Sequence, residues 1–151
     1  MRFKNTRDVL DHVKRFHQAV SARSMEVCGK SDQERVRILL NYISDREQDL
    51  AQAVSTFTEE TDDSILDTWF QYTTDDAALN SLLTDSIKPN MSPEDIMSTT
   101  MAISDHLLDM YRGMLDAAPT DALRQVFQNL LDHEQVEREH LARNLEMFQD
   151  L

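Results

Sequence analysis

The sequence is poor in the residues that build disulfides, tight loops and membrane spans. Its 151 residues include one cysteine, two glycines and three prolines. One cysteine excludes an internal disulfide framework and a cysteine-based zinc finger. Two glycines leave no glycine-rich phosphate loop and no nucleophile elbow. No apolar stretch approaches the roughly 20 residues that a membrane-spanning helix needs.

Positive charge is also scarce. Lys and Arg number 15 against 28 Asp and Glu, so the formal net charge is −13 at pH 7. Nucleic acids and anionic membrane surfaces repel such a chain, and we expect neither as a partner. The opening residues, MRFKNTRDVLDHVKRFH, contain no apolar segment of the kind that signal peptides carry. We therefore expect a cytoplasmic protein, and the length predicts one domain over residues 1–151.

Helical periodicity is the main pattern that the sequence does contain. Apolar residues recur at spacings of three, four and seven over residues 6–27, 32–57, 93–117 and 121–148. No segment shows the alternation that is typical of a strand. The pattern predicts an all-α fold: a four-helix bundle of two antiparallel hairpins joined by a long crossover over residues 58–91.

Local signals mark several helix ends. The segment from Ser31 to Glu34 reads as a capping box, which predicts a helix start there. Gly29, just before it, suits the left-handed conformation that ends many helices. Ser92 followed by Pro93 predicts the start of the third helix.

The crossover has features of its own. Its aromatic segment, Trp69 to Tyr72, is predicted to cover one end of the bundle, with a dimer contact as the alternative. Residues 77–83, AALNSLL, could form a short helix. A connection of this length is typical of a chain that crosses a bundle from one end to the other.

A few ionisable residues interrupt the apolar stripes. Glu47 occupies one place of the stripe in the second helix, and His17 lies among the core positions of the first. Glu137 lies on the stripe of the fourth helix, and His140, one turn further on, shares its face. A carboxylate inside a bundle is costly unless it is paired or coordinated. Since carboxylate and imidazole suit iron, manganese or zinc, these four residues are candidate ligands of a single ion. The alternative is a metal-free bundle in which Glu137 pairs with His140, inside or at the rim, and His17 bonds to Glu47 or Glu137.

The two predicted hairpins also repeat each other. A shift of 90 residues places Leu40 on Leu130 and Glu47 on Glu137. Helical periodicity alone matches apolar residues, so the glutamate match is the informative one. The stripe of the fourth helix comprises Leu123, Phe127, Leu130, Glu134, Glu137, Leu141, Asn144 and Phe148.

This layout, together with the stretch LDHEQVEREHLARNL over residues 131–145, resembles the ferritin-like superfamily, and its rubrerythrin-type members in particular. The resemblance implies a di-iron site built from a Glu on each of two helices and a Glu-x-x-His on each of the other two. It places Glu137 and His140 in ligand positions of the last helix, and Glu47 in that of the second.

The sequence departs from this family pattern at several places. Leu50 stands where the second Glu-x-x-His would have its histidine. The first helix offers His17 instead of a Glu, and the stripe of the third offers no carboxylate. The resemblance therefore implies an incomplete di-iron motif.

Three classes of function follow from an incomplete motif. The first is a bundle with a degenerate metal site that acts as a non-catalytic or stress-related interaction protein. The second is an iron- or manganese-dependent oxidase or peroxide scavenger that uses the reduced ligand set. The third is a structural homodimer. As partners we expect a second copy of the chain or an unidentified protein.

Overall fold

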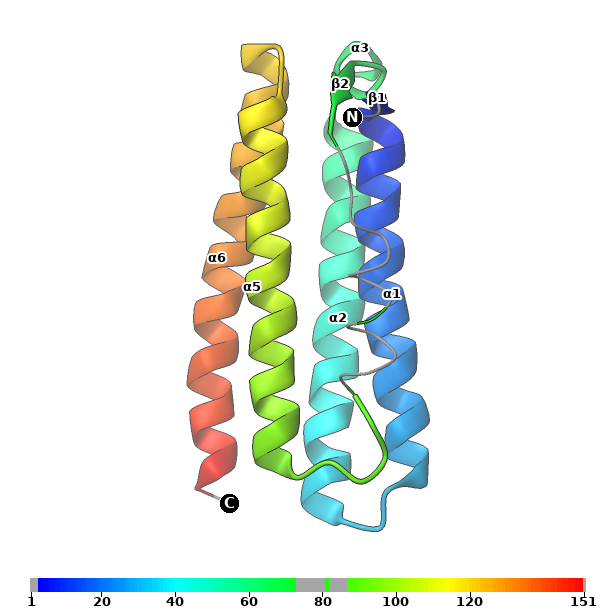
Figure 1. Cartoon of the computed structure of the whole chain (residues 1–151), viewed down its shortest axis with the longest axis vertical. Helices are drawn as coiled ribbons and strands as arrows, with labels where there is room; N and C mark the ends of the chain where they lie inside the picture. The colour runs from blue at the N-terminus through cyan, green and yellow to red at the C-terminus, as the bar shows by residue number, and fades with distance from the viewer. Residues whose placement is uncertain (1–2, 73–80, 82–86, 151) are drawn as a thin grey trace.

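The computed structural model describes residues 3–72, 81 and 87–150, and four long helices dominate it (Figure 1). In chain order the elements are β1 (Phe3–Asn5), α1 (Thr6–Lys30), α2 (Glu34–Glu60), α3 (Asp63–Leu66), β2 (Trp69–Gln71), α5 (Pro93–Ala117) and α6 (Asp121–Gln149). The predicted all-α fold is confirmed, and the four long helices correspond to the four periodic segments.

The long helices form two antiparallel hairpins, α1 with α2 and α5 with α6 (Figure 1). α2 ends at one end of the bundle, and α5 begins at the opposite end. The connection between the two hairpins therefore joins opposite ends of the bundle, which is what its length predicts. As a result α2 and α5 run in the same direction, and α1 runs parallel to α6.

Two short strands were not predicted from the sequence. β1 pairs with β2 in an antiparallel ladder, with Lys4 opposite Phe70. Thr6, the first residue of α1, continues this contact, because its backbone N–H and its hydroxyl both donate to the Thr68 carbonyl, at 3.0 and 2.8 Å. Strands of three residues are too short to show the alternation on which a sequence prediction rests.

The aromatic segment at β2 covers the end of the bundle where α1 begins (Figure 1). Phe70 is buried and packs against Phe127, with ring centroids 5.4 Å apart. The Tyr72 hydroxyl donates to the Met110 carbonyl at 3.3 Å. Trp69, by contrast, is 58% exposed.

The predicted start of the third helix is confirmed. Pro93 is the first residue of α5, and the Ser92 hydroxyl accepts a hydrogen bond from the Asp95 amide at 3.1 Å. The short helix predicted over residues 77–83 lies outside the described residues, apart from Ser81.

The boundary between α1 and α2 differs from the prediction. α1 continues through Gly29, which has no positive φ, and ends at Lys30. The N-cap of α2 is Gln33, which makes no side-chain capping bond, so the predicted capping box is wrong. Ser31 instead accepts from the Gln33 amide at 3.3 Å. A glycine that keeps an ordinary helical backbone does not end a helix, and the sequence signal therefore misplaced the boundary.

The core lies between the two hairpins. Its large, fully buried side chains come from all four long helices and include Leu10, Leu39, Leu40, Ile43, Ile96, Ile103, Leu107, Tyr111 and Phe127. Within the described residues, no helix combines the length and the apolar character that crossing a membrane requires.

Candidate functional site

Ionisable side chains lie buried in the middle of the bundle. His17 on α1 and Glu47 on α2 are 0% and 1% exposed, and Glu134 on α6 is 2% exposed. Arg46, also on α2, is 8% exposed. We call these four residues the ionic network. Their burial is unusual, because charged side chains leave water only when partners compensate them.

His17 is the centre of the ionic network. Its Nδ1 lies 2.5 Å from Oε2 of Glu47, and its Nε2 lies 3.1 Å from Oε1 of Glu134. The other oxygen of Glu47 accepts a hydrogen bond from Nη1 of Arg46 at 3.0 Å. Because Glu47 and Glu134 belong to different hairpins, the imidazole ring joins the two hairpins through charged hydrogen bonds.

The surroundings of His17 favour its protonated form. Burial by itself would lower the pKa of the imidazole, but the charge of Glu47 and the hydrogen bonds to both carboxylates outweigh it and raise the pKa to about 9. At neutral pH both ring nitrogens therefore donate. Two cations, His17 and Arg46, then balance two carboxylates, and the ionic network is formally neutral.

α5 contributes uncharged polar groups to the same interior. The hydroxyls of Ser104 and Tyr111 are buried and have no hydrogen-bond partner among the described residues, and the same holds for Oε2 of Glu134. Burial and the charges of Glu134 and Glu47 raise the pKa of Tyr111 well above its usual value. The phenol therefore stays protonated within the field of the two carboxylates.

The burial pattern repeats between the hairpins at a shift of 87 residues, not 90. This shift places Glu47 on Glu134 and His17 on Ser104, and all four are buried. The shift of 90 pairs Glu47 with Glu137, whose side chain is 29% exposed. Other pairs that are buried in both hairpins at the shift of 87 are Val9/Ile96, Phe16/Ile103, Val20/Leu107, Val27/Met114, Val36/Leu123, Leu40/Phe127, Ile43/Leu130 and Val54/Leu141.

The structure brings together two of the four predicted ligands. His17 and Glu47 are in contact, whereas Glu137 and His140 lie outside the ionic network. Their side chains are 29% and 51% exposed, and Nδ1 of His140 lies 3.8 Å from Oε1 of Glu137. Both line a surface groove between α2 and α6.

Sequence reasoning missed Glu134, Arg46 and Tyr111. Glu134 was visible as a member of the fourth-helix stripe, four residues after the buried Leu130. The match of whole buried stripes at a shift of 87 would have selected it over Glu137. Arg46 gave no such signal, because it is adjacent to Glu47 and so lies about 100° away around the helix.

The residues of the ionic network do not fit the di-iron centre that the ferritin-like resemblance implies. Both nitrogens of His17 are engaged by carboxylates, and the charges are already balanced. Ser104 occupies the place where α5 would supply a Glu, and Leu50 the place of one ligand histidine. In the part of the chain that the structure describes, no group of three or more His, Cys, Asp or Glu is placed to hold a metal ion. The arrangement instead favours a protonated His17, each of whose ring nitrogens faces one buried carboxylate.

Comparison of the chain with protein-family profiles, with curated proteins and with solved structures returned no match at the significance we required. The residues themselves establish an all-α bundle whose interior carries a charge-balanced ionic network.

Proposed function

We propose that this chain is a ferritin-like bundle in which the ionic network stands in place of a metal centre. We further propose that it acts as a non-catalytic protein, through contacts with a protein partner. The observation that carries this proposal is the position of the His17 ring between Glu47 and Glu134.

The arrangement of the helices supports the ferritin-like part of the proposal. Two antiparallel hairpins and an end-to-end crossover are the topology of that superfamily. The shift of 87 residues also aligns four buried polar residues, one from each long helix: His17 with Ser104, and Glu47 with Glu134. In a ferritin-like di-iron protein the corresponding four places would each hold a carboxylate.

The charges of the ionic network support the metal-free part. A divalent cation bound between Glu47 and Glu134 would have to displace the proton of His17 and compete with Arg46. Otherwise it would leave excess positive charge in a buried site, which is strongly unfavourable. The two protein cations thus occupy the electrostatic position that metal ions would take.

A variant that restores the family's ligand set tests this proposal. His17→Glu and Ser104→Glu supply the two single glutamates. Leu50→His and Glu137→His complete a Glu-x-x-His after Glu47 and after Glu134. We expect the fourfold variant to bind two iron(II) ions per chain under anaerobic conditions, and the wild-type chain to bind none at this site. Elemental analysis and calorimetric titration measure both.

The matched control for this experiment keeps the two histidines but omits the glutamates. A Leu50→His, Glu137→His chain retains His17, and we expect it to bind no iron in the interior. Two irons in the wild-type chain, with an oxo-bridge absorption band after oxygen is admitted, would contradict the metal-free proposal. A fourfold variant that folds, as judged by circular dichroism, but binds no iron would contradict the ferritin-like one.

A single-ion centre is the rival that one observation favours. Nε2 of His17 and a carboxylate oxygen of Glu134 lie close enough to share an ion, and Glu47 would then orient the ring from behind, as carboxylates behind metal-bound histidines do. This centre requires a neutral His17, so its affinity would rise steeply with pH up to about 9, with one proton released per ion. The metal-free proposal expects no such pH-dependent binding.

The outer face of α6 supports contact with a protein partner, and a second copy of this chain is the simplest one. Val136 and Met147 are 49% and 69% exposed. Eleven residues apart, they lie on the same side of the helix. We expect Val136→Lys with Met147→Lys to shift the protein from dimer to monomer in sedimentation velocity. The same masses for both chains would contradict this interface.

A further inference from the structure

The groove between α2 and α6 has a volume of about 460 Å³. Its lining mixes both signs of charge. Arg46, Arg143 and His140 contribute cationic or titratable groups, and Asp45, Asp49 and Glu137 contribute carboxylates. Arg46 lines this groove and also belongs to the ionic network, through its hydrogen bond to Glu47.

The Arg46 guanidinium makes hydrogen bonds with only part of its donor groups among the described residues. Its Nη1 donates to Glu47, which fixes the position of the planar group. The side chain is 7% exposed, and neither Nε nor Nη2 has a hydrogen-bond partner in the described part of the chain. These two nitrogens form one edge of the guanidinium, whose parallel N–H bonds match the two oxygens of a carboxylate. A buried, unsatisfied, charged donor edge is costly, and a bound anion would relieve that cost.

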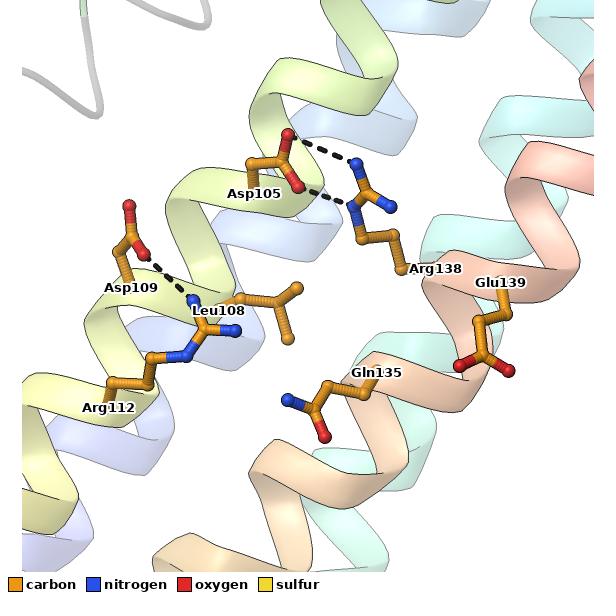
Figure 2. Close-up of a pocket in the computed structure, with 7 residues that line it drawn as sticks. All are labelled: Asp105, Leu108, Asp109, Arg112, Gln135, Arg138 and Glu139. Carbon is orange, nitrogen blue, oxygen red and sulfur yellow. Dashed lines mark hydrogen bonds and ion pairs between the residues drawn. The ribbon is translucent and has the colours of Figure 1, made fainter.

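A second groove in the same molecule shows how such an edge is normally filled. It lies on the α5–α6 hairpin and has a volume of about 670 Å³ (Figure 2). There Nε and Nη2 of Arg138 bind the two oxygens of Asp105 (Figure 2). Arg112 is likewise paired with Asp109, at 3.0 Å. In this second groove the Nε–Nη2 edge of Arg138 is filled by a carboxylate of the chain, whereas the same edge of Arg46 has no partner among the described residues.

We propose that the α2–α6 groove binds a small zwitterion of the amino-acid class. Its carboxylate would take the free edge of Arg46. Its ammonium group would face the carboxylates of Asp45, Asp49 and Glu137. A simple anion would be opposed by those same carboxylates and by the net charge of −13, while a zwitterion adds no charge and meets both signs.

Binding requires a small movement of the groove wall. Nε and Nη2 of Arg46 are shielded from water, so the groove wall has to shift before a ligand can reach them. His140 is suited to this, because it is 51% exposed and its contact with Glu137, at 3.8 Å, is long. Exposed side chains reorient within nanoseconds, so this movement adds no slow step.

Calorimetric titration of the full chain at pH 7 tests the proposal. The probes are glycine, β-alanine and 4-aminobutyrate, three zwitterions with increasing separation of charge, together with acetate and ethylamine, which carry one charge each. We expect saturable binding of at least one zwitterion, with acetate and ethylamine binding at least about tenfold more weakly, since each meets only half of the groove.

Variants locate the site. Arg46→Lys keeps the charge but loses the bidentate edge, and we expect about a tenfold loss of zwitterion affinity. Arg138→Lys, in the groove of Figure 2, is the matched control and should change nothing. Because Arg46 also supports the interior, Asp49→Asn on the exposed wall is the second variant. It should weaken zwitterion binding and, because it removes a charge that repels anions, leave acetate binding unweakened or slightly stronger.

Three results would overturn the proposal. The first is that no zwitterion binds at roughly 50 mM, a concentration that would saturate a millimolar site. The second is that acetate binds as tightly as the best zwitterion, which would make the groove a simple anion site. The third is that Arg138→Lys lowers the affinity as much as Arg46→Lys.

Discussion

The two hairpins of this bundle share one pattern of buried positions but differ in how their charges are compensated. In the first hairpin Glu47 has two cationic partners: His17 contacts its Oε2, and Arg46 donates to its Oε1. In the second, the only cationic partner of the equivalent Glu134 among the described residues is His17, and its Oε2 has no partner there. Ser104 occupies the position that corresponds to His17.

This difference indicates where the ionic network gains its stability. The first hairpin neutralises its own carboxylate, whereas, among the described residues, the charge of Glu134 is compensated only by a residue of the other hairpin. The bond between His17 and Glu134 therefore holds the hairpins together, while the contact between Arg46 and Glu47 does not. Substitutions at equivalent positions of the two hairpins should accordingly have unequal effects.

The largest difference in destabilisation is expected between substitutions of His17 and of Ser104. His17→Leu leaves two buried carboxylates without their shared cation and should lower the free energy of unfolding by about 3–5 kcal/mol. Ser104→Ala removes a hydroxyl that has no partner in the described residues and should change it by less than about 1 kcal/mol. Urea unfolding at pH 7 measures both. Equal losses would contradict a network centred on His17.

The titration of His17 is expected to set the pH dependence of stability between pH 6 and 9.5. Its pKa is about 9 in the folded protein and about 6.5 in the unfolded chain, so the folded state binds one more proton between these values. The stabilisation is fully present below pH 6.5 and is lost as the pH rises through 9, with a total of roughly 3 kcal/mol. Urea unfolding between pH 6 and 9.5 should show this slope, and the His17→Leu chain should lack it.

Substitutions of the two glutamates should differ by a smaller amount in the destabilisation that they cause. Glu47→Gln weakens charged hydrogen bonds to both His17 and Arg46, whereas Glu134→Gln weakens only one. Since a hydrogen bond to a charged group contributes roughly 1.5–3 kcal/mol, we expect Glu47→Gln to destabilise the protein by about 1–2 kcal/mol more. Denaturation midpoints at pH 7 measure both variants. A greater destabilisation by Glu134→Gln than by Glu47→Gln would contradict the prediction.

The smallest effect is expected at Tyr111. Its hydroxyl is buried near two carboxylates but has no hydrogen-bond partner in the residues described. Tyr111→Phe removes an unsatisfied polar group and keeps the ring, so the change should be neutral or stabilising by up to about 1 kcal/mol. Thermal unfolding measures it. A loss of 2 kcal/mol or more would show that the hydroxyl is bonded in solution.

The four long helices could be predicted because their signals are local. A stripe of apolar residues and a capping serine depend only on neighbours in the chain, and Ser92 caps α5 as expected. The strand at Phe3–Asn5 has no such local signal, because its pairing partner lies more than 60 residues away.

The ionic network could be predicted only in part, for reasons of helix geometry. Glu134 and Glu137 are about 60° apart around α6, and the packing of the two hairpins decides which of them turns inward. Arg46 is adjacent to Glu47 and starts on another face, but its long side chain reaches back into the interior. Neither the rotation of a helix nor the reach of a side chain can be read from periodicity.

The protonation state of His17 tests the central claim most directly. Two-bond ¹H–¹⁵N correlation spectra of the metal-free protein, with His17→Leu as the assignment control, report both ring nitrogens separately. The account predicts that both carry a proton at pH 7 and that the ring titrates near pH 9, because Glu47 and Glu134 each accept a hydrogen bond from it. A ring that is neutral at pH 7, with one nitrogen unprotonated, would contradict the ionic network and would favour a metal-binding histidine instead.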